Sequence, residues 1–260
     1  GIGCTGPVDP ITGVIGKVAL LPGWEGCALV ERLASLFGVT AAMENDADAA
    51  ALAEAMWGSG RGVDRFLYVT LSTGIGTGFL IDGKIYRGVD GSHPEMGHHG
   101  IDPAGPACYC GARGCWESVA SGSAIQTWFS ENDFSLRKEP GSLAAKQIFD
   151  LFKQGDALAI RAVERLSTYV GIGLANLTTI LVPGKIALGG GLIHSSDIFL
   201  PKAIEVFRSR CLEVPAQKTV IRPAMLQSDV GLLGAAAVWM QRPSGERHGG
   251  STVLPGIYLH

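Results

Sequence analysis

Three cysteines and a histidine crowd into one short segment, residues 95–117, and this segment constrains the fold more than any other feature of the chain. The cysteines have the spacing Cys-x-Cys-Gly-x-x-Gly-Cys, and a histidine lies ten residues before the first of them. Zinc in proteins prefers four thiolate and imidazole ligands arranged as a tetrahedron. The spacing therefore predicts a zinc site formed by His98, Cys108, Cys110 and Cys115.

Two details of the segment bear on this prediction. Gly111 and Gly114 lie between the cysteines, where glycine lets the backbone double back through positive φ. His99 is an alternative ligand to His98, because spacing alone does not choose between adjacent histidines. The competing interpretation is three unrelated buried cysteines, which the packing of glycines and thiols into one segment disfavours. The remaining cysteines are scattered and are predicted to be small core residues: Cys4, Cys27 and Cys211.

The composition is that of a globular protein and limits its partners. The 260 residues are 47% hydrophobic and 17% charged, which suits one large domain or two smaller lobes. A net charge of −3 without a Lys or Arg run disfavours nucleic acid or a membrane as the main partner. No stretch has the length and apolarity of a membrane span, and no secretory signal pattern opens the sequence. Together with the cysteine usage, this predicts a cytoplasmic protein.

Hydrophobic periodicity and turn residues divide the chain into alternating strands and helices, which predicts an α/β fold. Asp82-Gly83 is a hairpin signal between two strands. The predicted strands are 1–8, 66–71, 78–81, 84–86, 185–188 and 219–222. The predicted helices are 29–37, 47–57, 117–129, 142–153, 157–180, 197–211 and 231–240, and residues 242–260 have the composition of a loose tail.

Two glycine-rich segments are candidates for binding phosphate. The first, residues 72–78, separates two strands, and the backbone N–H groups of such a turn can surround anionic oxygens. The second, residues 189–191, lies between a strand and a helix, at the sheet edge where α/β proteins bind ligands. The first segment alone is better explained as a tight turn, and the second alone is only a modest signal. The pair, with a zinc loop between them, favours a phosphate site.

Acidic residues at three places are candidates for acid–base chemistry. Asp46 opens the alanine-rich helix, so it is either an N-cap of the first turn or a general base that takes a proton from a hydroxyl. Asn45 beside it is expected to hydrogen-bond the same substrate. Glu95 and Glu117 flank the cysteine segment, and folding around zinc can bring both to one pocket as acceptors for sugar hydroxyls. The alternative is two solvated surface glutamates, with Glu117 starting a helix.

Taken together, these segments resemble the ROK family of sugar kinases and sugar-responsive repressors from residue 1 to about residue 240. The family's Leu-x-x-Gly-Ile-Gly-x-Gly-Phe segment stands at 71–79 and is followed by Gly88, Pro94, Gly97 and His98. The zinc motif at 95–117 matches completely, as do Glu44-Asn45-Asp46 and the early Gly6-Pro7-Val8-Asp9 turn. Residues 189–191 match the family's adenosine segment.

The resemblance implies an actin-like ATPase fold of the ribonuclease H-like type, with two lobes and a sugar in the cleft between them. Residues 1–62, completed by a helix at 230–241, are expected to form what is present of the N-terminal lobe. Residues 63–229 are expected to form the C-terminal lobe with the zinc loop. The implied protein is a cytoplasmic kinase that transfers phosphate from ATP, with Mg²⁺, to a hexose hydroxyl. The resemblance also implies a homodimer.

The resemblance also implies a role for each site residue. Asp46 is the base, and the sugar is held by Asn45, Glu95, His98 and Glu117. The implied ATP-binding residues are Gly74, Gly76, Thr77, Gly78, Gly189, Gly190 and Gly191. Zinc is structural, because four protein ligands leave no open position, and it holds both glutamates at the sugar. Phosphoryl transfer then needs mainly positioning and charge neutralisation.

Two departures from the family pattern are expected to matter. Asp48 stands where the family usually has Asn, which adds a negative charge near the base. Family kinases also begin with a hairpin carrying Asp-x-Gly-Gly-Thr, the first phosphate loop, and no such motif occurs in these 260 residues. The N-terminal lobe is therefore expected to be incomplete, and the chain is expected to bind sugar better than it phosphorylates it.

Two other functions fit the same residues. One is the sugar-sensing module of a ROK-type repressor, whose DNA-binding helix-turn-helix would precede the kinase-like part. The other is a zinc-stabilised sugar binder without catalysis. The sequence does not choose among glucose, N-acetylmannosamine, N-acetylglucosamine, allose and fructose, because the shape of the pocket sets that preference.

Overall fold

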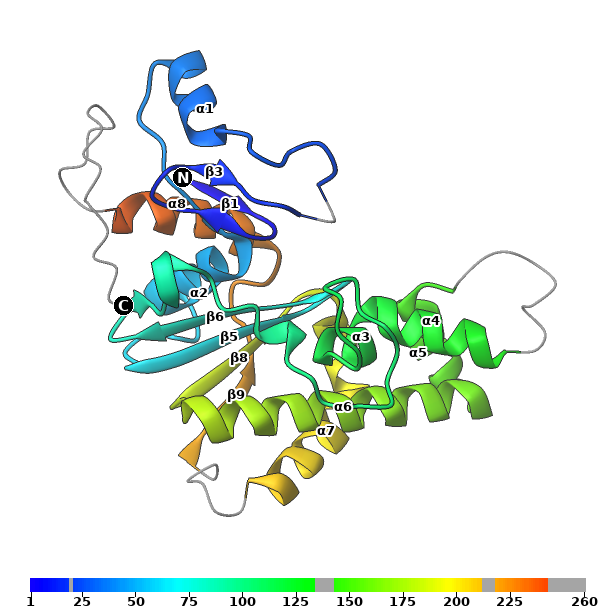
Figure 1. The fold of residues 1–260 in the computed structure, drawn as a ribbon. Coiled ribbons are helices and arrows are strands. Elements are labelled where there is room, and N and C mark those ends of the chain that lie inside the picture. The colour runs from blue at the N-terminus through cyan, green and yellow to red at the C-terminus, as the bar shows by residue number, and fades with distance from the viewer. Residues whose placement is uncertain (19–20, 134–142, 212–217, 243–260) are drawn as a thin grey trace, which may run out of the picture.

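The computed structural model describes residues 1–18, 21–133, 143–211 and 218–242, which form a mixed α/β molecule (Figure 1). The predicted tail at 242–260 lies outside the described residues, apart from Arg242, and so does the predicted helix start at 142. Among the described helices, none is both long and apolar enough to cross a membrane.

A five-stranded sheet in the order β7-β6-β5-β8-β9 forms the centre of the molecule. Its strands are β5 (Arg65–Leu71), β6 (Ile75–Ile81), β7 (Lys84–Ile85), β8 (Lys185–Gly189) and β9 (Val220–Pro223). Antiparallel pairs join β5, β6 and β7, whereas β8 is parallel to β5 and β9 is parallel to β8. Because Thr70 of β5 lies opposite Gly189 of β8, both glycine-rich segments leave the sheet at the same edge.

Alternating side chains on β5 divide the core between the two faces of the sheet. Leu67, Val69 and Leu71 pack in one cluster with five helices, and Phe66 and Tyr68 pack in another with two. The first face is covered by α3 (Trp116–Ala120), α4 (Gly122–Asn132), α5 (Ala145–Lys153), α6 (Ala157–Leu181) and α7 (Ser196–Arg210). The second face is covered by α2 (Asp46–Trp57) and α8 (Val230–Gln241).

The N-terminal residues form small elements above α2 and α8 in Figure 1. They are β1 (Ile2–Cys4), which is parallel to β4 (Met43–Asn45), the hairpin of β2 (Val8–Asp9) and β3 (Val14–Ile15), and α1 (Leu29–Phe37). The C-terminal α8 packs closely on α2, because a Cβ on Gly234 would lie only 3.0 Å from the carbonyl of Ala49. The C-terminal helix α8 therefore packs with the N-terminal segment. The predicted division into two lobes near residue 62 remains a prediction.

Most predicted elements agree with the structure to within a few residues, but three differ. Strand β6 begins at Ile75 rather than at residue 78, because each residue of 75–81 pairs with β5. The predicted helix at 117–129 is two helices, and Ser121 caps the second by accepting a hydrogen bond from the N–H of Ala124 at 3.1 Å. The predicted strand at 1–8 is the two short strands β1 and β2. Short 3₁₀ helices complete the described elements: η1 (Val89–Gly91), η2 (Met96–His98), η4 (Gly191–Ser195) and η6 (Gln227–Asp229).

Candidate active site and metal centre

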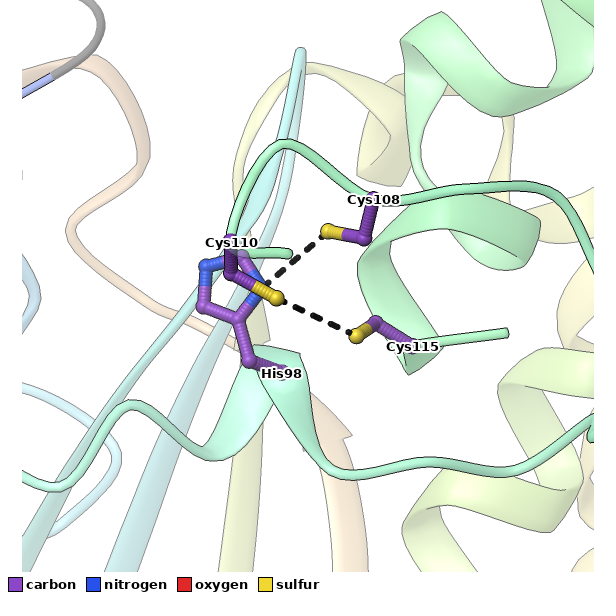
Figure 2. Close-up of side chains that lie close together, drawn as sticks. All are labelled: His98, Cys108, Cys110 and Cys115. Carbon is purple, nitrogen blue, oxygen red and sulfur yellow. Dashed lines mark hydrogen bonds between the residues drawn. The ribbon is translucent and has the colours of Figure 1, made fainter. Parts of the chain in front are cut away.

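The four predicted zinc ligands converge on one point, and Figure 2 shows their side chains close together. Their ligand atoms all lie within 4.8 Å of one another. Nδ1 of His98 is 3.5 Å from Sγ of Cys108, and Sγ of Cys110 is 3.6 Å from Sγ of Cys115. Ligands of a tetrahedral zinc ion, bound at about 2.0–2.3 Å, lie about 3.5–3.8 Å apart. The cluster is therefore compatible with zinc in donor set and in spacing.

The structure favours His98 over His99 as the imidazole of this cluster. Nδ1 of His99 lies 2.6 Å from the carbonyl oxygen of Met96, and its ring packs on Trp116 with the ring centroids 5.5 Å apart. His98 instead turns Nδ1 toward the cysteines and Nε2 toward the hydroxyl of Tyr109, at 3.0 Å. The imidazole of His98 thus directs one nitrogen toward the cysteine sulfurs and the other toward the hydroxyl of Tyr109.

The cysteine loop is held by its backbone turns and by one buried aromatic residue. Gly111 and Gly114 have φ of 96° and 62°, as the sequence predicts. Trp116 is fully buried, and its indole N–H donates a hydrogen bond to the carbonyl of Tyr169 on α6 at 2.9 Å. Burial raises the pKa of Cys115 to about 12, so this thiol is protonated near neutral pH and loses its proton on binding a metal.

A cleft of about 920 Å³ lies beside the metal cluster and is lined by every predicted sugar ligand. Residues 72–76, which follow β5, line the same cleft. Its volume falls within the range of small-molecule sites. The fold thus brings together the predicted sugar ligands from three separate segments: Asn45, Asp46, Glu95, His98 and Glu117.

Asn45, and not Asp46, caps helix α2. Oδ1 of Asn45 accepts hydrogen bonds from the N–H groups of Ala47 at 2.8 Å and Asp48 at 3.3 Å, and its Nδ2 donates to the carbonyl of Gly6 at 3.2 Å. Asp46 is the first helical residue and lines the cleft. Because the cleft walls shield its carboxyl from water, desolvation raises the pKa of Asp46. The N-cap predicted as one alternative for Asp46 is therefore Asn45.

The turn after β5 is docked on the start of α3 and α4. Oε2 of Glu117 accepts a hydrogen bond from the N–H of Ile75 at 2.8 Å. The N–H of Gly122 donates to the carbonyl of Ser72 at 2.7 Å. A Cβ on Gly74 would lie 2.4 Å from Oε2 of Glu117, so glycine is needed for this contact. Glu95 is exposed toward the cleft from a neighbouring wall.

Part of the first glycine-rich segment has a packing role that the sequence analysis did not foresee. Gly76, Thr77 and Gly78 lie inside β6 and not in a turn. A Cβ on Gly78 would lie 2.5 Å from the carbonyl oxygen of Ala47, so this glycine allows α2 to approach the sheet. Thr77 and Gly78 do not line the cleft, whereas Gly76 does.

The second glycine-rich segment lies next to the first. Gly190 has φ of 86°, and a Cβ on it would lie 2.4 Å from the carbonyl oxygen of Leu71. From Gly191, the ideal Cβ position is 3.9 Å from Oγ of Ser72. Residues 189–191 do not line the cleft, but they meet the turn that does. The two segments therefore form one glycine-rich edge.

A charged network that the sequence did not reveal lies behind the cleft wall. The carboxylate of Asp48 is fully buried, and its Oδ2 lies 2.8 Å from Nδ1 of His93 and 3.8 Å from the guanidinium of Arg87. Arg87 also forms an ion pair with Glu44, and His93 lines the cleft. Burial disfavours the charged ring, but the hydrogen bond and charge of Asp48 outweigh it and raise the pKa of His93. The one sequence signal was Asp at position 48 in place of the usual Asn.

Tyr109 is a further cleft residue that the sequence did not reveal. It lies between two of the cysteines, is 63% exposed and lines the cleft. Its ring meets that of His98 edge to face, with centroids 5.0 Å apart. Desolvation and the nearby carboxylate of Glu117 raise the pKa of Tyr109. Its phenol hydroxyl thus occupies a place between two predicted sugar ligands.

Solved structures similar to this one define the class of protein. A ROK hexokinase from Thermus thermophilus superposes with a TM-score of 0.81 at 35% identity, covering 93% of this chain and 78% of that one. A ROK family glucokinase from Streptomyces griseus, in complex with glucose and AMPPNP, has a TM-score of 0.78 at 30% identity, covering 91% and 79%. The fold is that of the actin-like ATPases to which sugar kinases belong, as the sequence analysis expects.

The sequence comparisons lead to the family. Residues 1–242 match the model of the ROK family, and the chain belongs to it. It is 33% identical over 255 residues to a glucokinase of Thermotoga maritima, covering 94% of this chain and 80% of that protein. It is also 31% identical over 224 residues to a xylose repressor of Bacillus subtilis, covering 85% of this chain and 56% of that protein.

Proposed function

We propose that the protein is an ATP-dependent hexose kinase of the glucokinase type. The observation that carries the proposal is the position of Asp46, which begins α2 and faces a cleft whose other walls include Glu95, His98 and Glu117. Similarity to glucokinases, one of them solved with glucose and AMPPNP, supports the same function.

In this proposal Asp46 is the general base for the acceptor hydroxyl. Desolvation raises its pKa, and a higher pKa makes a carboxylate a stronger base. Glu95, Glu117 and Nε2 of His98 bind other sugar hydroxyls, since carboxylates and imidazole nitrogens are suitable hydrogen-bond partners for them. Asn45 supports the base by capping α2, and its remaining Nδ2 hydrogen is the part that can reach a substrate.

The glycine-rich edge is the proposed nucleotide side of the cleft. Phosphoryl transfer depends mainly on positioning and on neutralising the phosphate charge. Gly74 and Gly76 line the cleft directly, and Gly191 lies beside the same turn. Thr77, Gly78, Gly189 and Gly190 shape this edge through packing. When bound, Mg²⁺ supplies part of the charge neutralisation.

Zinc in the Cys3His cluster is proposed to be structural, because four protein ligands complete a tetrahedron. His98 belongs to the cluster and lines the cleft, and Glu117 follows Cys115 by two residues. The cluster would therefore fix both sugar-binding side chains. A two-lobed division near residue 62 and a homodimer are further parts of the proposal and rest on the family resemblance.

The test is sugar-dependent formation of ADP, measured with a panel of hexoses. Asp46→Asn is expected to lower turnover by about 10²–10⁴-fold, because the amide cannot take the proton, and to leave sugar affinity within a few-fold. Asp150→Asn, on the exposed side of α5, is the matched control and should behave as wild type. Full turnover by Asp46→Asn would reject this residue as the base.

Sugar sensing without phosphorylation is the second candidate function. It is favoured by the similarity to a xylose repressor, which covers 85% of this chain. The same sugar ligands serve a sensor, but a sensor needs no base and no nucleotide. Micromolar binding of a hexose by calorimetry, with no ADP formed from ATP and Mg²⁺ even by a protein that also carries the Asp-x-Gly-Gly-Thr phosphate loop, would favour sensing over catalysis.

A further inference from the structure

The charged network of Asp48, His93, Arg87 and Glu44 behind the cleft has no part in the proposed reaction. We propose that His93 is a further substrate-binding residue that hydrogen-bonds one sugar hydroxyl, and that Asp48 is its positioning residue. The inference deepens the proposed function and rests on it, because it adds a contact within the same sugar site.

The orientation of the His93 ring is the first step. Nδ1 lies 2.8 Å from Oδ2 of Asp48, which belongs to the buried side of α2 and does not line the cleft. His93 does line it, although its side chain is only 4% exposed. The two ring nitrogens diverge, so a ring held by Nδ1 presents Nε2 elsewhere. Among the described residues, no hydrogen-bond partner reaches Nε2, and the atom is not enclosed like Oδ1 of Asp48.

The cost of burying Asp48 is the second step. A carboxylate removed from water is costly unless it is paired and hydrogen-bonded, and even a paired one adds little net stability. Asp48 is fully buried, and within the described chain its Oδ1 has no hydrogen-bond partner. A gain in folding stability is therefore a weak explanation for a carboxylate at position 48. Fixing the ring of a cleft residue is a stronger one.

The charged network lies beside Asp46, the proposed base. Glu44, the partner of Arg87, stands two residues before the base along the chain. Asp46 and His93 line the same cleft, and the positive charge of His93 opposes the rise in the pKa of Asp46 that desolvation causes. The charged groups that face His93 are Asp48 from α2, Arg87 after β7, and Glu95 and Asp46 in the cleft wall. A sugar hydroxyl held by His93 would lie close to the acceptor hydroxyl.

A thermodynamic cycle tests the contact. The binding of glucose and of 2-, 3-, 4- and 6-deoxyglucose is measured by calorimetry for wild type and for His93→Ala. Loss of one hydrogen bond, stronger when it involves a charged group, is expected to weaken glucose binding by about 10-fold in His93→Ala. For one deoxy sugar, the penalty seen with wild type should disappear in His93→Ala, while the other three keep theirs. Four unchanged penalties would overturn the inference.

Variants of Asp48 separate positioning from a merely structural role. Asp48→Asn keeps an oxygen that can accept from Nδ1–H, so glucose affinity should stay within about 3-fold of wild type. Asp48→Ala should lose about 10-fold in affinity and should not respond to the deoxy sugar that His93 recognises. Equal losses in both variants, or none in Asp48→Ala while it remains folded by circular dichroism, would overturn the positioning role.

A control and the wild-type result keep the two proposals apart. His194→Ala removes an exposed histidine outside the cleft and should bind all five sugars as wild type does. If wild type binds glucose and His93→Ala shows the same five affinities, the inference about His93 fails and the proposed function stands. If wild type binds no hexose at all, the proposed function itself fails.

Discussion

Oε2 of Glu117 accepts a hydrogen bond from the backbone N–H of Ile75 at 2.8 Å, across 42 residues of sequence. Glu117 follows the last cysteine of the metal cluster, and Ile75 follows the glycine turn after β5. The contact therefore connects the metal loop to the glycine-rich edge of the cleft. A substitution in the metal loop is therefore expected to alter the glycine-rich edge, and a substitution at that edge to alter the metal loop.

Replacing Glu117 tests this connection directly. Glu117→Ala removes the acceptor, whereas Glu117→Gln keeps one side-chain oxygen for the N–H of Ile75. We expect amide hydrogen exchange at Ile75 to be faster by about 10-fold or more in Glu117→Ala, because hydrogen bonds to charged groups contribute about 1.5–3 kcal/mol. The Gln variant should lie between Ala and wild type. Equal protection of Ile75 in all three proteins would contradict the connection.

The metal site predicts a stoichiometry. We expect about one zinc ion per chain by elemental analysis, and a substantial loss of zinc in Cys110→Ser, because a hydroxyl is a poor zinc ligand. The melting temperature should fall in parallel, since binding free energy at a structural zinc site contributes to folding. Cys27→Ser, outside the cluster, is the control and should retain zinc. Zinc-free wild-type protein, or full zinc content in Cys110→Ser, would reject the site.

The sequence was sufficient where the signal is local. The cysteine spacing, the Asp-Gly hairpin and the alanine-rich helix each depend on residues close together in the chain, and the structure agrees with all three. Element bounds failed where tertiary contacts decide them. The sequence predicts Gly76 in a turn before a strand that begins at residue 78, but pairing with β5 places it inside the strand, and Gly78 allows α2 to approach.

The parts of the site that the sequence could not reveal depend on contacts between distant segments. His93 and Asp48 are 45 residues apart and neither stands in a recognisable motif with the other. The ring of His99 packs against Trp116, which leaves His98 for the metal cluster. The spacing of residues in the sequence carries no information about that packing. Similarly, Asn45 and Asp46 are both good helix caps in isolation, and only the geometry of α2 distinguishes them.

Gly173 on α6 makes room for the buried indole of Trp116. A Cβ at this position would lie 2.0 Å from Cε2 of Trp116, and the indole is fully buried. Gly173→Ala is therefore expected to lower the free energy of unfolding by about 1–3 kcal/mol through overpacking. Gly231→Ala, in helix α8 where a Cβ meets nothing within 4 Å, is the control and should be neutral or stabilising by up to about 1 kcal/mol. Urea unfolding measures both, and equal stability of the two variants would contradict the packing argument.

The ion pair of His93 and Asp48 predicts a pH dependence of stability. Burial disfavours the charged ring, but the hydrogen bond and charge of Asp48 raise the pKa of His93 above its unfolded value of 6.5. The folded state therefore binds this proton more tightly, and the stability it contributes is complete below about pH 6.5 and lost as the pH rises through the folded pKa. The free energy of unfolding of wild type should exceed that of His93→Gln by more at about pH 6 than at about pH 9. A difference that does not change with pH would show that folding does not shift the pKa of His93.

Glu54 has a buried carboxylate that makes a substitution at this position, outside the cleft, costly in stability. Its fully buried carboxylate accepts hydrogen bonds from the N–H of Ser59 at 2.7 Å, the hydroxyl of Ser59 at 2.8 Å and the N–H of Leu226 at 2.8 Å. It thereby ties the end of α2 to the segment that leads into α8. Glu54→Ala leaves buried donors without an acceptor, so we expect the free energy of unfolding to fall by about 3–5 kcal/mol.

Two further variants separate this effect from the loss of a charge. Glu54→Gln keeps the shape and one acceptor oxygen, but its NH₂ group faces a donor, so its loss should be smaller than that of Glu54→Ala and still clear. Glu31→Ala, on the exposed side of α1, should stay within about 0.5 kcal/mol of wild type. The three variants are compared with wild type by urea unfolding, with one common value for the dependence of the free energy of unfolding on urea concentration. If Glu54→Ala is as stable as Glu31→Ala, the carboxylate does not hold α2 and α8 together, and the packing between the two helices must be sufficient without it.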